Sequence, residues 1–198
     1  FKNNLSFYDT TYAKSLGVPT SSFKNELNNM GVKHNKHWGL IDRWELNANG
    51  DITNSHNWLD LNLIDFAHER GVKVKLCATL FGQEPLETLL SNYFYRQNAI
   101  SNLLDLVVSK NADGIDIDFE LLPTNQRENL VLFMEELSFA FHSEMEDPII
   151  TMATPAIDWS NAWNYEALAE ITDGLFIMGY NYFYSGSLNA GPVSPLGA

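Results

Sequence analysis

The chain has 198 residues and a formal net charge of -13 at pH 7. A surface this acidic repels phosphate backbones and anionic lipid, which argues against nucleic acid or a membrane as a partner and favours a neutral or cationic ligand. Hydrophobic residues make up 45% and aromatic residues 13%, which is typical of a globular protein, and we expect residues 1–198 to form a single domain.

The first half of the chain begins with a predicted strand at residues 37–46, followed by the turn-like sequence NANGD at 47–51. A helix is predicted at 58–70, with Gly71 where a helix end favours a left-handed residue. The run KVKLCATL at 73–80 then predicts a strand.

The second half repeats this alternation: helices are predicted at 98–110, 125–145 and 164–171, and strands at 113–120, 148–153 and 175–181. This order implies parallel strands joined by right-handed crossovers, and therefore an α/β fold. An open doubly wound sheet and a closed (β/α)8 barrel both fit. Neither GxGxxG nor a P-loop is present to favour a nucleotide-binding open sheet.

The sequence DGIDIDFE at 113–120 holds four carboxylates in eight residues. A calcium loop would place polar residues and a central glycine between its ligands. A solvated charge run would not carry large apolar residues at alternate positions. A strand, whose side chains alternate between faces, instead puts Asp116, Asp118 and Glu120 together on one face.

In a barrel these three carboxylates would point toward the axis, where burial and like charge raise their pKa values until at least one holds a proton at neutral pH. Catalytic residues of barrels lie at the carboxyl ends of strands, so Glu120 is predicted as a general acid, with Asp118 and Asp116 progressively deeper. Gly114 has the same inward parity and would leave space at the axis.

Cysteine and histidine carry little functional signal. The single cysteine, Cys77, excludes an internal disulfide and is predicted to be a buried thiol. The five histidines show no ligand spacing, so we expect neither a metal site nor a cofactor.

No apolar run is long enough to span a membrane. We expect an extracellular, periplasmic or cell-surface protein of bacterial origin, with its leader absent from this chain.

The stretch DGIDIDFE matches the DxxDxDxE signature of glycoside hydrolase family 18, the chitinase family, and the chain resembles a member of it. IMGY at 177–180 resembles the MxYD strand, ITMATPA at 150–156 the strand before it, and KVKLCATLFG at 73–82 takes the place of the SxGG strand. The resemblance implies a (β/α)8 TIM barrel. About six of its eight strand-helix units fit in residues 1–198, so we expect a partial catalytic domain.

The resemblance also implies a retaining hydrolase of β-1,4-linked, N-acetylglucosamine-containing glycans that needs no cofactor. Glu120 would protonate the glycosidic oxygen while the substrate's own 2-acetamido carbonyl attacks the anomeric carbon, giving an oxazolinium ion. Asp118 would orient the acetamido group, Asp116 would share a proton with Asp118, and Tyr180 would hydrogen-bond the acetamido carbonyl. Asp113 and Gly114 complete the motif structurally.

Further residues are expected to contact the sugar, because carbohydrate sites stack aromatic rings on sugar rings; packing in the core or in a loop is the alternative for each. The aromatic candidates are Tyr182, Trp44 and Trp159, together with Phe183 and Tyr184. Asn181, where the family usually has aspartate, and Met178, on an inward strand face, are two further candidates. Met178 and Met152 are both predicted on inward strand faces.

The chain departs from the family pattern at two places within the matched strands. Asn181 stands where the family usually has aspartate, and CATLFG lacks an evident serine and first glycine of SxGG. The substrate stays open between chitin, chitooligosaccharide, peptidoglycan-related glycan and the core of an N-linked glycan. A lectin-like binding module is the alternative to an enzyme, and the presence of Glu120 favours the enzyme.

Overall fold

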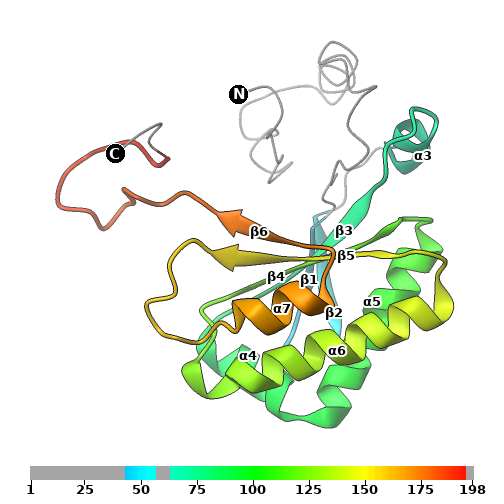
Figure 1. Ribbon diagram of the computed structural model, residues 1–198, viewed down its shortest axis with the longest axis horizontal. Coiled ribbons are helices and arrows are strands. Elements are labelled where there is room, and N and C mark those ends of the chain that lie inside the picture. Colours follow the sequence, from blue (N-terminus) through cyan, green and yellow to red (C-terminus); the bar gives the residue numbers. More distant parts are fainter. Residues whose placement is uncertain (1–42, 57–62, 195–198) are drawn as a thin grey trace.

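The computed structural model describes residues 43–56 and 63–194, whose strands form one six-stranded sheet in the order β2-β1-β3-β4-β5-β6 (Figure 1). The strands are β1 (Arg43–Leu46), β2 (Ile52–His56), β3 (Lys75–Phe81), β4 (Gly114–Glu120), β5 (Ile149–Pro155) and β6 (Gly174–Met178). β2 runs antiparallel to β1, and every other neighbouring pair is parallel. The carboxyl ends of β3 to β6 therefore meet at one end of the sheet.

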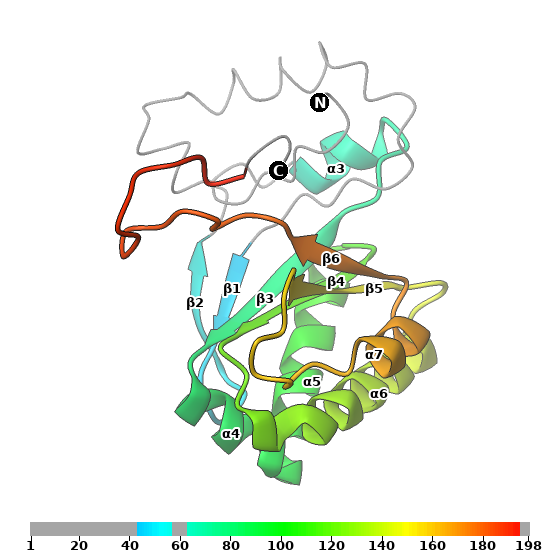
Figure 2. The same ribbon diagram turned by 60° about the vertical axis from the view of Figure 1, so that its left-hand side comes forward.

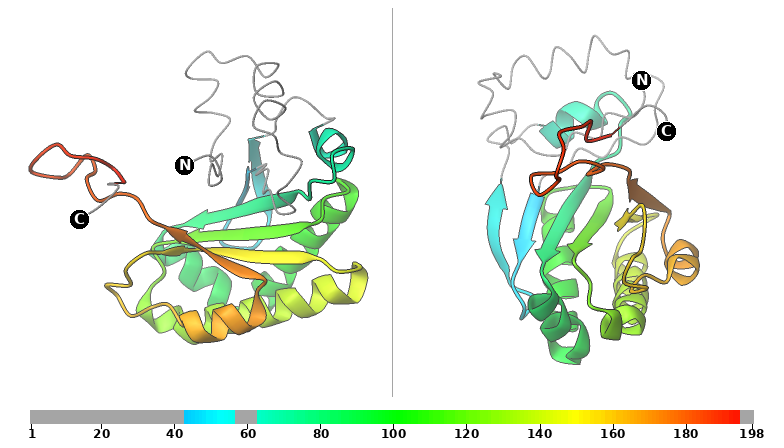
Figure 3. Two further views of the ribbon diagram at one scale, coloured as in Figure 1. Left: turned by 45° about the horizontal axis from the view of Figure 1, so that its top comes forward. Right: turned by 90° about the vertical axis from the view of Figure 1, so that its left-hand side faces the viewer.

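The helices α4 to α7 cover one face of this sheet (Figures 1 and 3). The helices are α3 (Leu63–His68), α4 (Gln83–Ser91), α5 (Tyr93–Ser109), α6 (Arg127–Glu144) and α7 (Tyr165–Ile171), with a short 3-10 turn η2 (Thr124–Gln126) before α6. A doubly wound sheet would place helices on both faces, whereas a barrel places them outside only. The one-sided cover favours the barrel type.

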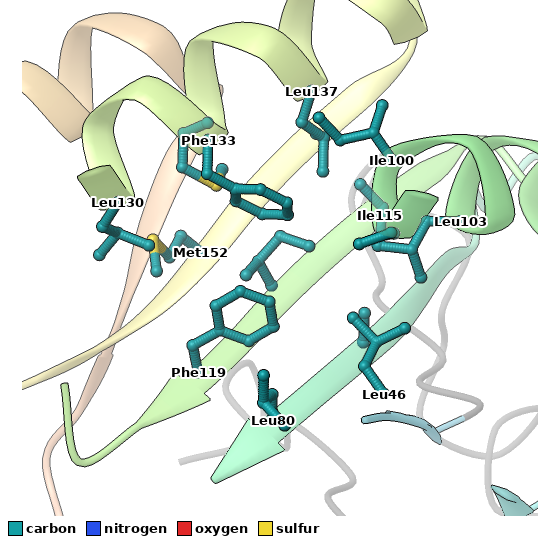
Figure 4. Packing of buried hydrophobic residues seen from close by; sticks show 14 of the residues in the cluster. Leu46, Leu80, Ile100, Leu103, Ile115, Phe119, Leu130, Phe133, Leu137 and Met152 are labelled. Atoms are coloured by element: carbon teal, nitrogen blue, oxygen red, sulfur yellow. The ribbon is translucent and has the colours of Figure 1, made fainter. Parts of the chain in front are cut away.

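The hydrophobic core lies between this helix-covered face and the helices (Figure 4). Leu130, Phe133 and Leu137 recur at helical spacing on α6, are fully buried, and face apolar side chains of β4 and β5. Burying each such side chain stabilises the fold by about 1.5–3 kcal/mol. The helix predicted at 125–145 is confirmed, and its apolar residues at helical spacing form the face that packs on the sheet.

The predicted turn at 47–51 is confirmed, and it closes a hairpin whose second strand, β2, was not predicted (Figure 2). Asn47 Oδ1 accepts from the backbone N–H groups of Asn49 and Asp51 at 2.9 and 3.0 Å. Gly50 has a φ of 85°, and a Cβ there would lie 2.5 Å from Tyr95 O in α5, so only glycine fits. The short, polar sequence ITNSH of β2 has no clear strand pattern, which explains the omission.

One helix was not predicted, and one helix boundary differs from the sequence prediction. α4 was not predicted, because Pro85 argues against a helix; it lies in the first turn, where its missing N–H costs no hydrogen bond. α5 begins at Tyr93 rather than at residue 98, because the Asn92 side chain caps it by accepting from the N–H groups of Phe94 and Tyr95. Of the predicted strand 37–46 and helix 58–70, residues 37–42 and 58–62 lie outside the described residues.

An Asp-Gly pair at the amino end of β4 joins it to its neighbours. Asp113 Oδ2 accepts from Val74 N at 2.6 Å and lies 2.8 Å from His68 Nε2, which ties β4 to the start of β3 and to α3. A Cβ on Gly114 would lie 1.9 Å from Ile149 O, so the space that was expected at the barrel axis is occupied by the backbone of β5.

A second Asp-Gly pair precedes β6. Asp173 Oδ2 accepts from Ile150 N at 2.7 Å, as Asp113 does from the strand before it. Nothing lies within 4 Å of a Cβ built on Gly174. Both aspartates thus accept from a backbone N–H at the start of the preceding strand. Glycine is sterically required at position 114 but not at position 174.

In the part of the chain that the structure describes, β2 and β6 are the two edges of the sheet and do not pair with each other. The α/β class and the parallel order of β3 to β6 are confirmed. The described strands form an open, strongly twisted sheet of the barrel type (Figure 3).

Replacing Gly114 by alanine should lower the free energy of unfolding by about 2–3 kcal/mol, because the new methyl group overlaps the carbonyl of Ile149. Urea unfolding followed by circular dichroism measures this loss. Gly174→Ala is the matched control, since it changes the same residue type in the same Asp-Gly context without an overlap. Equal losses in the two variants would contradict the steric account.

Candidate active site

Strand β4 has one apolar face and one acidic face, as its alternating sequence predicts. On the side that we call the acidic face, Asp116 is 2% exposed, Asp118 is 5% exposed, and Glu120 is intermediate. The apolar residues of the opposite face are fully buried in the core: Ile115, Ile117 and Phe119. The three carboxylates thus lie at increasing depth from the carboxyl end of the strand, and their shared face is confirmed.

Asp116 is the deepest of the three and is held by side chains from both neighbouring strands. The Thr151 hydroxyl of β5 donates to Asp116 Oδ1, and Lys75 Nζ of β3 lies 3.9 Å from the same oxygen. Burial raises the pKa of Asp116 above its ordinary value, and Lys75 and Thr151 oppose this rise only in part. Asp116 Oδ2 is buried and has no hydrogen-bond partner among the described residues.

Glu120 lies at the mouth, where β4 ends. Its carbonyl accepts from Gly82 N at 3.1 Å, and Leu121 follows with a φ of 65°, which ends the strand. Phe81 lies opposite Glu120 in the strand register and is 41% exposed. It lines a pocket of about 420 Å³ that also contains Glu45. Phe81 was not predicted at this site, because the strand predicted at 73–80 ends one residue before it.

Tyr180 lies just after β6 and within electrostatic reach of the acidic face. Burial, together with the negative charges of Asp118 and Glu120, raises the pKa of its phenol to about 12. The phenol therefore keeps its proton at neutral pH and can donate a hydrogen bond. The predicted hydrogen bond from Tyr180 to the acetamido carbonyl stays a prediction.

The segment that follows β6 presents polar and aromatic side chains at the same end. Asn181 has a φ of 62°, a conformation that asparagine adopts more readily than most residues. Tyr182 is 61% exposed, and its N–H donates to Val193 O at 3.0 Å. Tyr184 is 65% exposed, and Phe183 is intermediate. Their contact with sugar stays a prediction.

Three other residues singled out from the sequence lie at the edge of the acidic face of β4 or away from it. Met178 ends β6 with the same parity as Thr151, on the side of the acidic face. Trp159 is 89% exposed in the loop after β5 and stays a candidate. Met152 lies opposite Ile117 and is fully buried in the helix-side core, so its predicted inward direction is wrong.

Trp44 was also expected near the sugar and lies on the other face of the sheet. It pairs with Ala78, packs in the helix-side core at 8% exposure, and has Lys110 Nζ 5.6 Å from its ring centre. The face of the sheet on which Trp44 lies depends on the register of β1 with β3, which the sequence alone does not give. The structure therefore removes Trp44 from the candidate sugar contacts.

Cys77 is buried at 1% exposure, as predicted, and lies opposite Asp116 in the register of β3 and β4. Within residues 43–56 and 63–194, no group of three or more histidine, cysteine, aspartate or glutamate side chains is arranged to hold a metal ion. None of the helices in these ranges is both long and apolar enough to span a bilayer.

Parallel strands covered by helices on one face, with carboxylates leading to the carboxyl ends, define the (β/α)-barrel class of domain. The sequence model of Glycosyl hydrolases family 18 matches residues 10–198. The chain belongs to this family.

Curated relatives and solved structures agree with this assignment. The chain is 28% identical over 166 residues to a Bacillus subtilis (strain 168) protein named as a sporulation-specific glycosylase, YdhD, and 29% identical over 133 residues to human di-N-acetylchitobiase. These matches cover 79% and 62% of this chain but 38% and 32% of the relatives. The chain thus spans about a third of the length of the curated relatives that it matches.

The solved structure of YdhD superposes with a TM-score of 0.68 at 27% identity, covering 77% of this chain and 52% of that one. The C-terminal domain of a protein named as a chitinase from Desulfitobacterium hafniense DCB-2 gives 0.70 at 26% identity, covering 82% and 51%. A class V chitinase from Pseudomonas fluorescens Pf-5 gives 0.74 at 18% identity, covering 86% and 56%, which shows the shared fold.

Neutralising Asp118 should lower the pKa of Tyr180 from about 12, because a nearby negative charge disfavours the phenolate. Titration of ¹³Cζ-labelled tyrosine by NMR in the protein and in Asp118→Asn measures this change. Asp105→Asn, on the exposed side of α5, is the control and should leave Tyr180 unchanged. An unaltered Tyr180 titration in Asp118→Asn would show that the two groups are not coupled.

Proposed function

We propose that the chain carries the catalytic carboxylates of a retaining glycoside hydrolase that cleaves β-1,4-linked, N-acetylglucosamine-containing glycans. The observation that carries the proposal is the acidic face of β4, on which two buried aspartates lead to a partly exposed glutamate at the mouth. Membership of family 18 supports the same class of reaction.

The different burial of the carboxylates fits two different roles, with the outermost one as the general acid and the buried ones acting on its surroundings. Glu120 is nearest to solvent and can meet the glycosidic oxygen, whereas Asp116 is too deep to touch a sugar. Neighbouring carboxylates repel one another when all are ionised, which raises the free energy of the fully charged state. The acidic face therefore retains at least one proton at neutral pH. A carboxyl group that is protonated near neutral pH is the form a general acid requires.

The proposed reaction uses the substrate as the nucleophile. Glu120 gives its proton to the glycosidic oxygen while the 2-acetamido carbonyl oxygen bonds to the anomeric carbon, and the bond to the leaving sugar breaks. Water then bonds to the anomeric carbon of the oxazolinium ion, the bond from that carbon to the acetamido oxygen breaks and re-forms the acetamido carbonyl, and the Glu120 carboxylate takes the proton of the water. Two inversions at this carbon retain its configuration.

Asp118 and Tyr180 would act on the acetamido group. Asp118 lies next to Glu120 on the same face and would orient the acetamido N–H and balance the positive charge of the oxazolinium ring. Tyr180 keeps its phenolic proton because its pKa is about 12, so it can donate to the acetamido carbonyl oxygen at neutral pH. Asn181 would contact the sugar as a neutral group where the family usually has a carboxylate.

Which class of glycan the protein cleaves is a separate and more specific proposal than the reaction type. Chitin, chitooligosaccharide, peptidoglycan-related glycan and the N-glycan core all present the acetamido group that this reaction needs. Relatives at 28–29% identity are named as a sporulation-specific glycosylase and as di-N-acetylchitobiase, which agrees with several of these substrates. These glycans are found outside the cytoplasm, so we also propose an extracellular, periplasmic or cell-surface site of action.

Replacing Glu120 by glutamine should lower kcat on a chromogenic chitobioside by about 100- to 10,000-fold in the intact protein, because the amide cannot donate the proton. Binding of chitooligosaccharide, measured by calorimetry, should change little. Glu128→Gln, an exposed carboxylate on α6, is the matched control and should retain activity. Near-normal hydrolysis by Glu120→Gln would remove Glu120 from the mechanism, and binding without hydrolysis by the unaltered protein would favour a lectin-like module.

A substrate with a hydroxyl in place of the 2-acetamido group should not be cleaved. The proposed nucleophile is then missing, and β4 offers no second carboxylate at the mouth to replace it. Comparing chitobioside and cellobioside carrying the same chromogenic leaving group measures this dependence. Comparable kcat values on the two would contradict substrate assistance while leaving glycosidase activity in place.

A further inference from the structure

The pocket of about 420 Å³ beside Phe81 lies where β1 and β3 end, and the proposed reaction leaves it without a role. Four of the described residues that line it have aliphatic side chains: Leu46, Ala48, Leu80 and Pro85. Among the described lining residues, Glu45 is the only one that ionises at neutral pH. A carboxylate beside apolar walls is less screened than one in open water, so the charge of a ligand group in this pocket affects how tightly the ligand binds.

Glu45 lies on the same side of the sheet as the acidic face of β4. It pairs with Thr79 of β3, and Thr79 pairs with Asp118 of β4, so the three residues form one row across the sheet. The residues on either side of Glu45 in β1 are buried in the helix-side core. Neighbouring strands are about 4.8 Å apart, which puts Glu45 about 10 Å across the sheet from Asp118. Glu45 is therefore too far from β4 to take part in proton transfer at Glu120.

Phe81 connects this pocket to the mouth of the acidic face. It lies opposite Glu120 in the register of β3 and β4, lines the pocket, and is 41% exposed. An exposed aromatic ring offers a large apolar surface on which the apolar face of a sugar ring can pack. A sugar in contact with Phe81 would lie next to Glu120 on one side, with its substituents within reach of Glu45 on the other.

The backbone around Glu45 is held by its neighbours. Thr53 Oγ1 donates to Glu45 O and Thr79 Oγ1 donates to Trp44 O, each at 3.3 Å, which joins β1 to β2 and to β3. The turn after β1 packs against α5 through the close approach of Gly50 to that helix. A preformed pocket needs little ordering when a ligand binds, so a charge in it contributes directly to the difference in affinity between ligands.

The carboxylates around this pocket favour ligand groups that are neutral or positively charged. Glu45 lines the pocket, Asp118 and Glu120 lie on β4, and the formal net charge of the chain is -13. A carboxylate on a sugar would be repelled here and a protonated amine attracted, whereas an uncharged acetamido group would be affected little. The candidate glycans differ in this property: chitin is neutral, its de-N-acetylated form is cationic, and the lactyl group of N-acetylmuramic acid in peptidoglycan carries a carboxylate when it is not linked to peptide.

We propose that Glu45 is a specificity-determining residue that favours N-acetylglucosamine and glucosamine over N-acetylmuramic acid as the sugar next to the cleaved bond. The inference rests on the proposed function and deepens it, because it selects chitin-type glycan, fully or partly acetylated, from the substrates that share the acetamido group. Glu45 acts through its charge on the sugar that contacts Phe81.

Calorimetry with three tetrasaccharides tests this inference: chitotetraose, the tetramer of glucosamine, and alternating N-acetylglucosamine and N-acetylmuramic acid without peptide. All affinities are measured in the full chain carrying Glu120→Gln, so that the probes are not cleaved, and at about pH 6, where the amine is protonated and the lactyl carboxyl is ionised. Adding Glu45→Gln should weaken binding of the glucosamine tetramer about fivefold, tighten binding of the muramic acid probe about fivefold, and change chitotetraose by less than about twofold. Opposite changes in one variant cannot come from damage to the fold.

Glu84→Gln is the matched control. It removes the same charge from an exposed position in the first turn of α4, next to Pro85 but outside the lining of the pocket. All three affinities should stay within about twofold, because water and salt screen an exposed charge. Glu45→Asp keeps the charge and should preserve the order of the three affinities.

A salt series on the protein with Glu45 intact serves if Glu45→Gln does not fold. Its preference for the glucosamine tetramer over the muramic acid probe should fall several-fold from low to high salt, because salt screens the charge. A preference that does not depend on salt, unchanged affinity ratios in Glu45→Gln, or equal changes in Glu84→Gln would overturn the inference. Absent hydrolysis of a chromogenic chitobioside by the unaltered protein would overturn only the proposed function.

Discussion

The two-sided burial of β4 is the constraint on which the rest of the structure depends. Its apolar side chains are fully buried against the helices, while Asp116 and Asp118 are almost as deeply buried on the other side. A register slip of one residue would put carboxylates into the hydrocarbon core and apolar groups on the acidic face, so both faces enforce the same pairing. The stability of the core and the placement of Glu120 therefore come from a single choice of register.

The amino ends of the strands fix that register. Asp113 binds the backbone of Val74, and Asp173 binds the backbone of Ile150, in each case at the start of the preceding strand. At β4 the close approach of Gly114 to Ile149 adds a steric stop. Because β4 and β5 are aligned there, Thr151 comes to lie beside Asp116. Geometry that is set at one end of the sheet thus determines which groups meet halfway along it.

The sequence alone predicted those features that depend on local periodicity. The alternation in DGIDIDFE gave the acidic face, and the helical spacing of Leu130 and Phe133 gave a core helix. Features that depend on pairing between distant strands were missed or wrong. The face of the sheet toward which Trp44 points depends on its pairing with Ala78 of β3. The hydrogen bond between Lys75 and Thr151 likewise depends on how β3 and β5 lie in the sheet. The helix containing Pro85 was missed because a residue that stops most helices is harmless in the first turn.

The Asp-Gly pairs have a consequence for how barrels of this kind can change. In each pair the acceptor is a side chain, but the donor is a backbone N–H of the strand before it, which almost any residue supplies. This bond therefore sets no requirement on the side chains at the start of the preceding strand. Substitutions there that keep the backbone in place leave the junction bonded, whereas loss of the aspartate breaks it.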